Sequence, residues 1–110
     1  MTGKPVSLRS RARQDIDEAL DHYRVAAGEA VTLGFVDALE VAFANLAAQP
    51  AIGSLRYAYE LDLPGLRVWP LRKYPWLIFY TDIGQQIDVW RVLHAKRDIP
   101  VWMAEMPGDA

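Results

Sequence analysis

The chain has 110 residues, of which 52% are hydrophobic and 24% are charged, so it can bury one core as a single domain. It contains no cysteine, which excludes a disulfide framework, a thiolate metal site and a cysteine nucleophile. Its formal net charge of −2 argues against a protein that coats nucleic acid.

The first half of the chain predicts a strand and two helices. Residues 6–9 alternate apolar and polar side chains and predict a short strand. Ser10 is expected to cap the next helix, because its hydroxyl can accept a backbone N–H. Apolar residues then recur at three- and four-residue spacings up to Gly28, and again over residues 29–48, where Pro50 ends the pattern. Two helices joined at a glycine predict a hairpin whose apolar face covers a sheet.

The second half predicts an antiparallel meander of strands. Residues 55–61 alternate in polarity, and residues 66–72 follow as the next predicted strand. Residues 76–80 are a continuous apolar run, which is typical of a strand buried on both faces. Residues 87–93 follow a short glycine-containing break and complete a hairpin. The predicted fold is α+β, with an N-terminal strand and a two-helix hairpin packed on an antiparallel sheet of about four strands.

One domain over residues 1–110 is expected, with its core in residues 6–100. Asp98 can cap a last helical turn that tolerates Pro100, and residues 107–110 are expected to be disordered. No basic and apolar pair of segments resembles a signal peptide, and no apolar segment approaches the roughly 20 residues of a membrane span. We therefore expect a cytoplasmic protein that does not bind a membrane.

Charge is distributed unevenly along the chain. Residues 15–48 carry seven acidic side chains and one basic side chain, whereas residues 55–97 carry seven basic and four acidic side chains. A basic sheet face could bind an acidic partner or a phosphate backbone, although both regions can also be ordinary solvated faces. The last predicted strand runs into a polar cluster at a position where sites are often built: His94, Lys96, Arg97 and Asp98.

Four segments of this sequence resemble ParE-type toxins of the RelE/ParE superfamily, the toxin halves of bacterial type II toxin–antitoxin pairs. The segments are ARQDIDEALDHYRVAAG, LAAQPAIGSLR, LRVWPLRKYPWLIFY and VWRVLHAKRDIP. The last is the most specific, because a strand ends in a hydrophobic residue and His94, and Arg97 and Asp98 follow after two intervening residues. The resemblance covers residues 6–100.

The resemblance implies a small RelE-like α+β domain and a role in plasmid stabilisation. It implies a cognate antitoxin whose C-terminal segment wraps the toxin, and DNA gyrase as the target that the toxin poisons. The sequence itself shows no metal-binding cluster, no phosphate-binding glycine motif and no Ser/His/Asp arrangement, so we expect no cofactor and no metal. We also expect no direct specific binding of nucleic acid. The residues assigned to target binding are His94, Lys96 and Arg97.

The antitoxin is expected to bind an exposed sheet edge and a groove beside the helical hairpin, adding a strand or an amphipathic helix. Basic and aromatic side chains are the expected anchors, because interfaces favour Trp, Tyr and Arg. The residues assigned to this surface are Arg56, Arg67, Trp69, Arg72, Arg91 and Trp102.

Two alternatives remain open on the same fold. The superfamily also contains ribosome-dependent mRNA endoribonucleases, which need a general base, a general acid and cations that stabilise phosphorane charge. The candidates for that chemistry are Arg72, Lys73, Tyr80, His94 and Arg97. The acidic and apolar C-terminus resembles the inhibitors more than the nucleases. The second alternative is a non-toxic member that only binds its antitoxin.

Several of these residues also have purely structural interpretations. His94 can hydrogen-bond nearby backbone, and Arg97 can pair with a carboxylate. His22 is interpreted as a helix surface residue. Tyr57 and Tyr59 would share one face of a strand. Of the tryptophans, two are assigned to the core and two could be core residues or interface anchors; they are Trp76 and Trp90, and Trp69 and Trp102, respectively.

Overall fold

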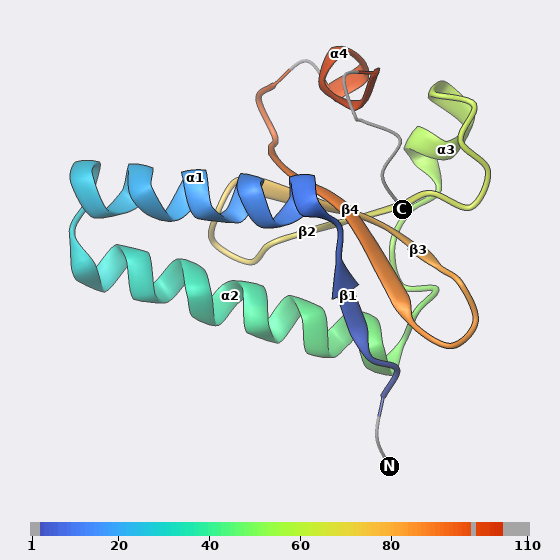
Figure 1. Ribbon diagram of the computed structural model, residues 1–110, viewed down its shortest axis with the longest axis horizontal. Coiled ribbons are helices and arrows are strands. Elements are labelled where there is room, and N and C mark those ends of the chain that lie inside the picture. Colours follow the sequence, from blue (N-terminus) through green and yellow to red (C-terminus); the bar gives the residue numbers. More distant parts are fainter. Residues whose placement is uncertain (1–2, 98, 105–110) are drawn as a thin grey trace.

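The computed structural model describes residues 3–97 and 99–104, and these residues form the predicted α+β fold (Figure 1). Asp98 and residues 107–110 lie outside the described residues, and so do the predictions made for them. The elements, in chain order, are β1 Val6–Leu8, α1 Ser10–Ala26, α2 Glu29–Ala48, α3 Arg56–Glu60, β2 Arg67–Pro70, β3 Trp76–Asp82, β4 Ile87–His94 and α4 Ile99–Ala104.

The helical hairpin is confirmed, and it turns at Gly28. This residue has a φ of 88°, which residues with a side chain rarely adopt, and its N–H donates to the carbonyl of Tyr23. The prediction for Ser10 was wrong. Arg9 occupies the position before the helix, Ser10 is its first residue, and no side chain caps this end.

The sheet has four strands in the order β1-β4-β3-β2, but it is mixed rather than antiparallel. β2, β3 and β4 form the predicted antiparallel meander. β1 is parallel to β4 and pairs only with Ile87–Val89. Parallel strands need a long crossover, which α1, α2 and the meander supply here. A bulge between Phe79 and Tyr80 shifts the register of β3 against β4.

Residues 55–61 do not form a strand, and this prediction was wrong. They contain the short helix α3 instead, in which Tyr57 is 8% exposed and Tyr59 is 81% exposed, so the two tyrosines do not share a face. Ser54 makes one antiparallel bridge to Val68 just before this helix. The alternating Leu and Tyr positions therefore mark a helix that packs one tyrosine and exposes the next.

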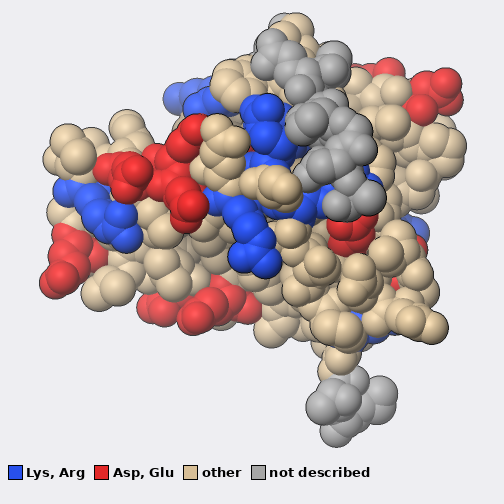
Figure 2. All heavy atoms as spheres, in the orientation of Figure 1, with Lys and Arg blue, Asp and Glu red and all other residues tan. Residues whose placement is uncertain are grey.

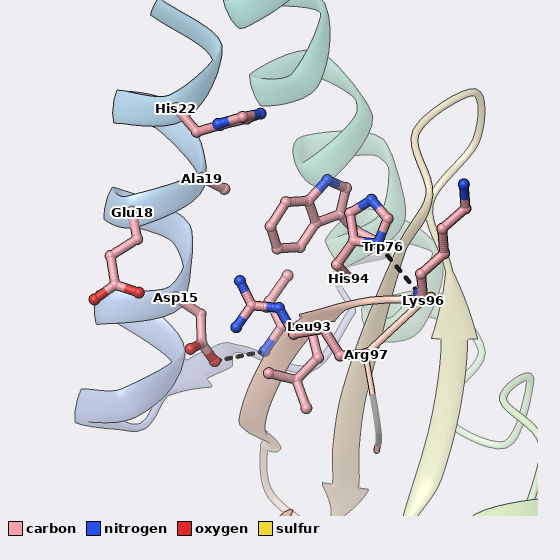
Figure 3. A pocket seen from close by; sticks show the side chains of 10 residues that line it. Asp15, Glu18, Ala19, His22, Trp76, Leu93, His94, Lys96 and Arg97 are labelled. Atoms are coloured by element: carbon pink, nitrogen blue, oxygen red, sulfur yellow. Dashed lines mark hydrogen bonds between the residues drawn. The ribbon is translucent and has the colours of Figure 1, made fainter. Parts of the chain in front are cut away.

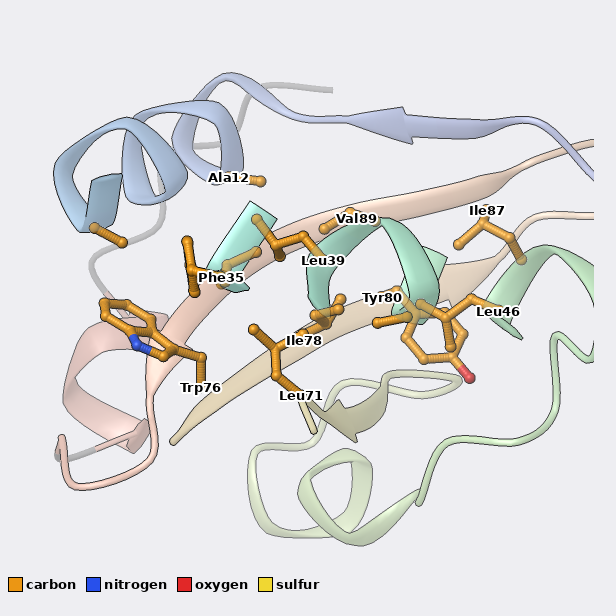
Figure 4. Packing of buried hydrophobic residues seen from close by; sticks show 13 residues of the cluster. Ala12, Phe35, Leu39, Leu46, Leu71, Trp76, Ile78, Tyr80, Ile87 and Val89 are labelled. Atoms are coloured by element: carbon orange, nitrogen blue, oxygen red, sulfur yellow. The ribbon is translucent and has the colours of Figure 1, made fainter. Parts of the chain in front are cut away.

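Both faces of the sheet are covered, as the continuous apolar run in β3 predicts. On one face, α2 presents Phe35, Leu39 and Leu46 to Ile78 and Tyr80 (Figure 4). A second cluster on the other face brings together residues of α3, the strands and α4: Tyr57, Leu66, Val68, Phe79, Leu93, Ile99 and Met103. The side chains in these two clusters are buried, so most of them are not available to a binding partner.

α2 is long and apolar enough to cross a membrane by length and composition alone, with a mean hydropathy of 1.5 over Glu29–Ala48. The prediction that no such segment exists was wrong in that respect. A core helix of a soluble protein meets the same criterion, and α2 packs against the sheet through Phe35, Leu39 and Leu46. Its outer side leaves Leu33 and Val41 more than half exposed.

Charged side chains are unevenly spread over the surface. Figure 2 shows Asp and Glu side chains mainly on the left of the view, where Figure 1 places the far end of the helical hairpin. Lys and Arg side chains gather near the middle of the same face. The asymmetry expected from the sequence therefore also exists in space.

Candidate functional site

A cavity of about 350 Å³ lies between α1 and the end of β4 (Figure 3). We call it the β4-end pocket. α1 contributes acidic side chains and one histidine, and the segment at the end of β4 contributes one histidine and two basic side chains. Its apolar lining is Ala19, Trp76, Val92 and Leu93, and its titratable lining is Asp15, Glu18, His22, His94, Lys96 and Arg97.

A buried ion pair forms the base of this pocket. The Nε and Nη2 atoms of Arg91 each donate to the Asp15 carboxylate at 2.8 Å, in a bidentate arrangement. Asp15 also accepts the backbone N–H of Val92 at 3.0 Å, and Arg91 donates a third bond to the carbonyl of Trp102. β1 pairs with β4 only as far as Val89, so it does not reach the backbone N–H of Val92. The Asp15 side chain of α1 accepts that N–H instead.

This geometry corrects the assignment of Arg91 to an exposed partner surface. Its side chain is fully buried, and Asp15 is only 7% exposed. A buried guanidinium needs such a partner because an unpaired buried charge is costly. Arg91 therefore joins α1, β4 and α4 inside the molecule.

His94 lies at the end of β4, opposite Trp76 at the start of β3. Its Nδ1 accepts the backbone N–H of Lys96 at 3.2 Å, so neutral His94 carries its proton on Nε2. Partial burial lowers the pKa of His94 below its ordinary value, and Lys96, Arg97 and His22 lower this pKa further by like-charge repulsion. The neutral side chain is thus the favoured form near neutral pH.

Lys96 and Arg97 are exposed and keep their charges available. The Arg97 guanidinium stacks 4.0 Å above the Trp102 ring, a cation–π contact. Within residues 3–97 and 99–104, no carboxylate lies within ion-pair distance of either side chain. Two cations that the described part of the chain leaves without an ion-pair partner therefore stand beside the cavity.

The five residues proposed for nuclease chemistry do not gather at one place. Tyr80 is buried, and its hydroxyl donates to the carbonyl of Pro50 and accepts the N–H of Gly53. Burial raises the pKa of Tyr80, which disfavours its ionisation. It lies four residues along β3 from Trp76, which is about 13 Å at the usual rise of a strand. Tyr80 therefore stands apart from His94.

A second cavity of about 350 Å³ lies between α2 and β2, and we call it the α2–β2 groove. The sequence predicted a groove beside the helical hairpin, and this one is lined by Trp69 and Arg72 of the expected antitoxin set. Its remaining lining is mostly apolar: Ala38, Val41, Ala42, Asn45, Pro70 and Leu71. Val41 is 54% exposed, so the groove is open along the helix.

β2 is the edge strand of the sheet, but its free edge is partly occupied. Val68 exchanges both backbone hydrogen bonds with Ser54, at 2.9 Å each. Pro70 has no N–H to offer an added strand. The edge of β2 therefore offers an added strand few free hydrogen-bond donors.

The remaining basic and aromatic residues expected to bind the antitoxin do not line the α2–β2 groove. Arg56 is exposed on α3, where its guanidinium lies over the Tyr57 ring. Arg67 is half-buried and donates to the carbonyls of Ala51 and Gly53. Trp102 is half-buried on α4, beside Arg97.

The tryptophans follow most of the sequence-based assignments. Trp76 is a core residue at 7% exposure, and its indole N–H donates to the Tyr23 hydroxyl at 2.9 Å. Trp90 packs beside the second core cluster and is half-buried, with the Arg9 guanidinium 4.3 Å from its ring centre. Trp69 and Trp102 are both partly buried, so each combines packing with an exposed portion.

Sequence reasoning did not assign Asp15, Glu18 or His22 to a site. His22 is exposed, as expected, yet it also lines the β4-end pocket. These residues and Ala19 recur at three- and four-residue spacings, which places them on one face of α1. Asp15 lies within the apolar stripe of α1, and this was the signal that the buried face of the helix contacts a charged side chain, which is Arg91. Among the described residues, no cluster of three or more side chains could hold a metal ion.

Comparison with known proteins gives a consistent result. The sequence profile of the family described as "ParE toxin of type II toxin-antitoxin system, parDE" matches residues 6–99. Comparison with curated protein sequences gives no match. Among the solved structures with this fold is one titled "Chromosomal ParDE TA system from P. aeruginosa", with a TM-score of 0.71 and 21% identity over 84% of this chain and 97% of that chain. The chain belongs to the ParE toxin family and is the toxin component of a type II toxin–antitoxin system, whose partner is an antitoxin.

Proposed function

We propose that this toxin acts by poisoning DNA gyrase and that a cognate antitoxin prevents it from doing so. Membership of the ParE family supports a protein as the target. The β4-end pocket is the site at which we propose that the toxin binds this target. The observation that carries the proposal is the pair of exposed cations, Lys96 and Arg97, beside a cavity that is lined in part by apolar side chains. Hydrophobic contact and unpaired charge together are typical of a protein-binding site.

In this proposal, His94, Lys96 and Arg97 contact the target. His94 offers the proton on Nε2, because Nδ1 is occupied by backbone. Lys96 and Arg97 supply charge that the described part of the chain leaves unneutralised. The compact fold and the family indicate a soluble protein, and we propose the cytoplasm as its location, because that compartment holds gyrase.

The antitoxin is proposed to occupy the α2–β2 groove with an amphipathic segment. Exposed apolar surface on Val41 and partial exposure of Trp69 favour burial of a partner's apolar side chains. Arg72 at the groove and Arg56 on α3 would pair with acidic residues of that partner. Arg67 already donates hydrogen bonds to the carbonyls of Ala51 and Gly53, so we expect it to contribute less to antitoxin binding than Arg56 and Arg72 do.

A gyrase cleavage assay tests the proposed target. Purified toxin is added to gyrase, ATP and plasmid DNA, and trapped double-strand breaks are counted with and without the antitoxin. We expect breaks that the antitoxin suppresses, and we expect the Lys96→Gln, Arg97→Gln double variant to lose them while still binding the antitoxin. Arg13→Gln, which changes an exposed base elsewhere on α1, is the matched control.

No breaks from a chain that still binds its antitoxin would reject gyrase as the target. Translating ribosomes would then be tested with Arg72 and His94 variants, because the endoribonuclease alternative predicts cleaved mRNA. No activity in either assay would leave the non-toxic, antitoxin-binding alternative. The separation of Tyr80 from His94 gives the nuclease reading less support than the inhibitor reading.

A further inference from the structure

We propose that the β4-end pocket receives one carboxylate side chain, a Glu or Asp, from the protein that the toxin inhibits. This inference rests on the proposed function and adds the chemistry of the contact. The pocket is lined by cationic and imidazole hydrogen-bond donors and also by apolar side chains. Its volume is large enough for one side chain of a partner. A glutamate would place its methylenes against Ala19, Trp76 and Leu93 and its carboxylate among the donors.

The donors come from two sides of the cavity. His22 projects from α1, and His94 stands across from it at the end of β4 (Figure 3). The Arg97 guanidinium extends toward α1, whereas the Lys96 side chain points away from α1. Arg97 is held over Trp102, so its planar fork is partly preorganised for a carboxylate.

Two carboxylates line the pocket, Asp15 and Glu18, and each already accepts hydrogen bonds within the chain. Asp15 is fully engaged by Arg91 and the N–H of Val92. Glu18 accepts a hydrogen bond from Gln14 at 3.0 Å on the helix surface. An incoming anion would therefore meet donors that the described residues do not already satisfy.

The surroundings favour a single carboxylate over a nucleic acid. Glu18 of α1 lines the pocket, and Asp17 and Asp21 are further exposed acids of the same helix. A duplex places a negative charge about every 1.7 Å along its axis, so a backbone lying across this site would also run along acidic side chains. A half-enclosed cavity of about 350 Å³ admits one side chain and excludes a duplex.

Protonation of His94 would be coupled to binding. A bound carboxylate beside His94 favours the charged imidazole, so the affinity should rise as the pH falls through the range where His94 titrates. The charged and titratable groups that face this position are Asp15, Glu18 and His22 of α1, Arg91 of β4, and Lys96 and Arg97 after it.

An NMR titration of the full chain tests this ligand chemistry without gyrase. The probe is N-acetylglutamate amide, with N-acetylglutamine amide as the neutral match and a short DNA duplex as the phosphate source. We expect the glutamate probe alone to shift the His94 ring signals in a saturable way and to raise the pKa of His94. The Lys96→Gln, Arg97→Gln variant should bind it about tenfold more weakly, as expected for a lost charge-assisted hydrogen bond. Arg13→Gln should bind it unchanged.

Equal shifts with the glutamine probe, no saturation with the glutamate probe, or stronger binding of the duplex would each overturn the inference. The gyrase cleavage assay tests the target independently of this NMR titration. Trapped gyrase without binding of the glutamate probe would reject the carboxylate and keep the target. Binding of the probe without trapped gyrase would reject the target and keep the ligand chemistry of the pocket.

Discussion

Asp15 makes more hydrogen bonds to other elements than any surface acid of α1, so it is the first residue to test. Asp15→Asn keeps the shape of the side chain but leaves the fully buried Arg91 without its counter-charge. Removing one partner of a buried pair typically costs about 3–5 kcal/mol. We expect a fall of that size in the free energy of unfolding, measured by urea denaturation.

Asp17→Asn is the matched control, because Asp17 is an exposed acid two residues away on the same helix. Its effect should stay within about 0.5 kcal/mol, as for most surface substitutions. If both variants lost the same small amount, Asp15 would be shown not to stabilise the joint between α1, β4 and α4.

His94 predicts a pH dependence whose sign follows from its lowered pKa. In the folded chain this pKa lies below the ordinary value of 6.5. Between the two values the unfolded chain binds more protons at His94 than the folded chain, so acidification destabilises the fold there. Relative to His94→Gln, the parent chain should lose stability as the pH falls through 6.5 and level off below the folded pKa.

Urea unfolding of both chains above and below pH 6.5, at constant ionic strength, measures this difference. Parallel curves for parent and variant across that range would show that His94 titrates alike in both states. An opposite slope would mean that an acid near the pocket outweighs the repulsion from Lys96 and Arg97.

At the scale of elements, the long periodic segments were predictable and the short one was not. α1 and α2 carry apolar stripes over many residues, and β3 is a continuous apolar run, so each has one consistent interpretation. α3 has five residues, too few to separate a period of 2 from a period of 3.6. The alternation of Tyr57 and Tyr59 with polar or small residues therefore predicted a strand where the chain forms a helix.

Pairing between distant elements could not be predicted from local pattern. β1 aligns Val6 with Ile87 in parallel, and nothing within the first strand specifies that partner. The bulge at Phe79 and Tyr80 also changes how β4 presents its residues, and it left no clear sequence signal. Arg91 pairs with Phe79 beside this bulge, and its guanidinium contacts Asp15 of α1 and the carbonyl of Trp102 in α4, which local pattern does not place.

The loop before α3 packs closely against β3, which makes Gly53 sensitive to substitution. A Cβ at Gly53 would lie 2.6 Å from the Tyr80 hydroxyl and 3.0 Å from the carbonyl oxygen of Val68. The N–H of Gly53 also donates to that hydroxyl. Gly53→Ala should lower the free energy of unfolding by about 1–3 kcal/mol, the usual cost of overpacking, as measured by urea denaturation.

Tyr80→Phe removes the hydroxyl that is both the nearest clashing atom and the acceptor of the Gly53 N–H. Gly53→Ala should cost less in the Tyr80→Phe background than in the parent chain, because the nearest clashing atom is gone. Strictly additive effects in this double-mutant cycle would show that the clash with the hydroxyl does not cause the loss.

At the scale of the whole molecule, the two cavities give the toxin two separate surfaces. The β4-end pocket lies between α1 and β4, whereas the α2–β2 groove lies beside the edge strand. The sequence predicted the groove and the basic cluster at the end of β4. It could not predict the wall that α1 supplies to the pocket, because that wall depends on where a distant helix packs.

The division into two surfaces predicts how antitoxin binding responds to charge. Arg56→Glu and Arg72→Glu should each weaken the complex by about two- to fivefold, the size expected for exposed charge pairs. The loss should shrink at high salt, because exposed charges are screened. Surface plasmon resonance with the cognate antitoxin measures both effects, and Arg13→Glu is the control because it reverses an exposed base away from the groove. Unchanged affinity in both variants would show that the antitoxin is held by the apolar groove without these arginines.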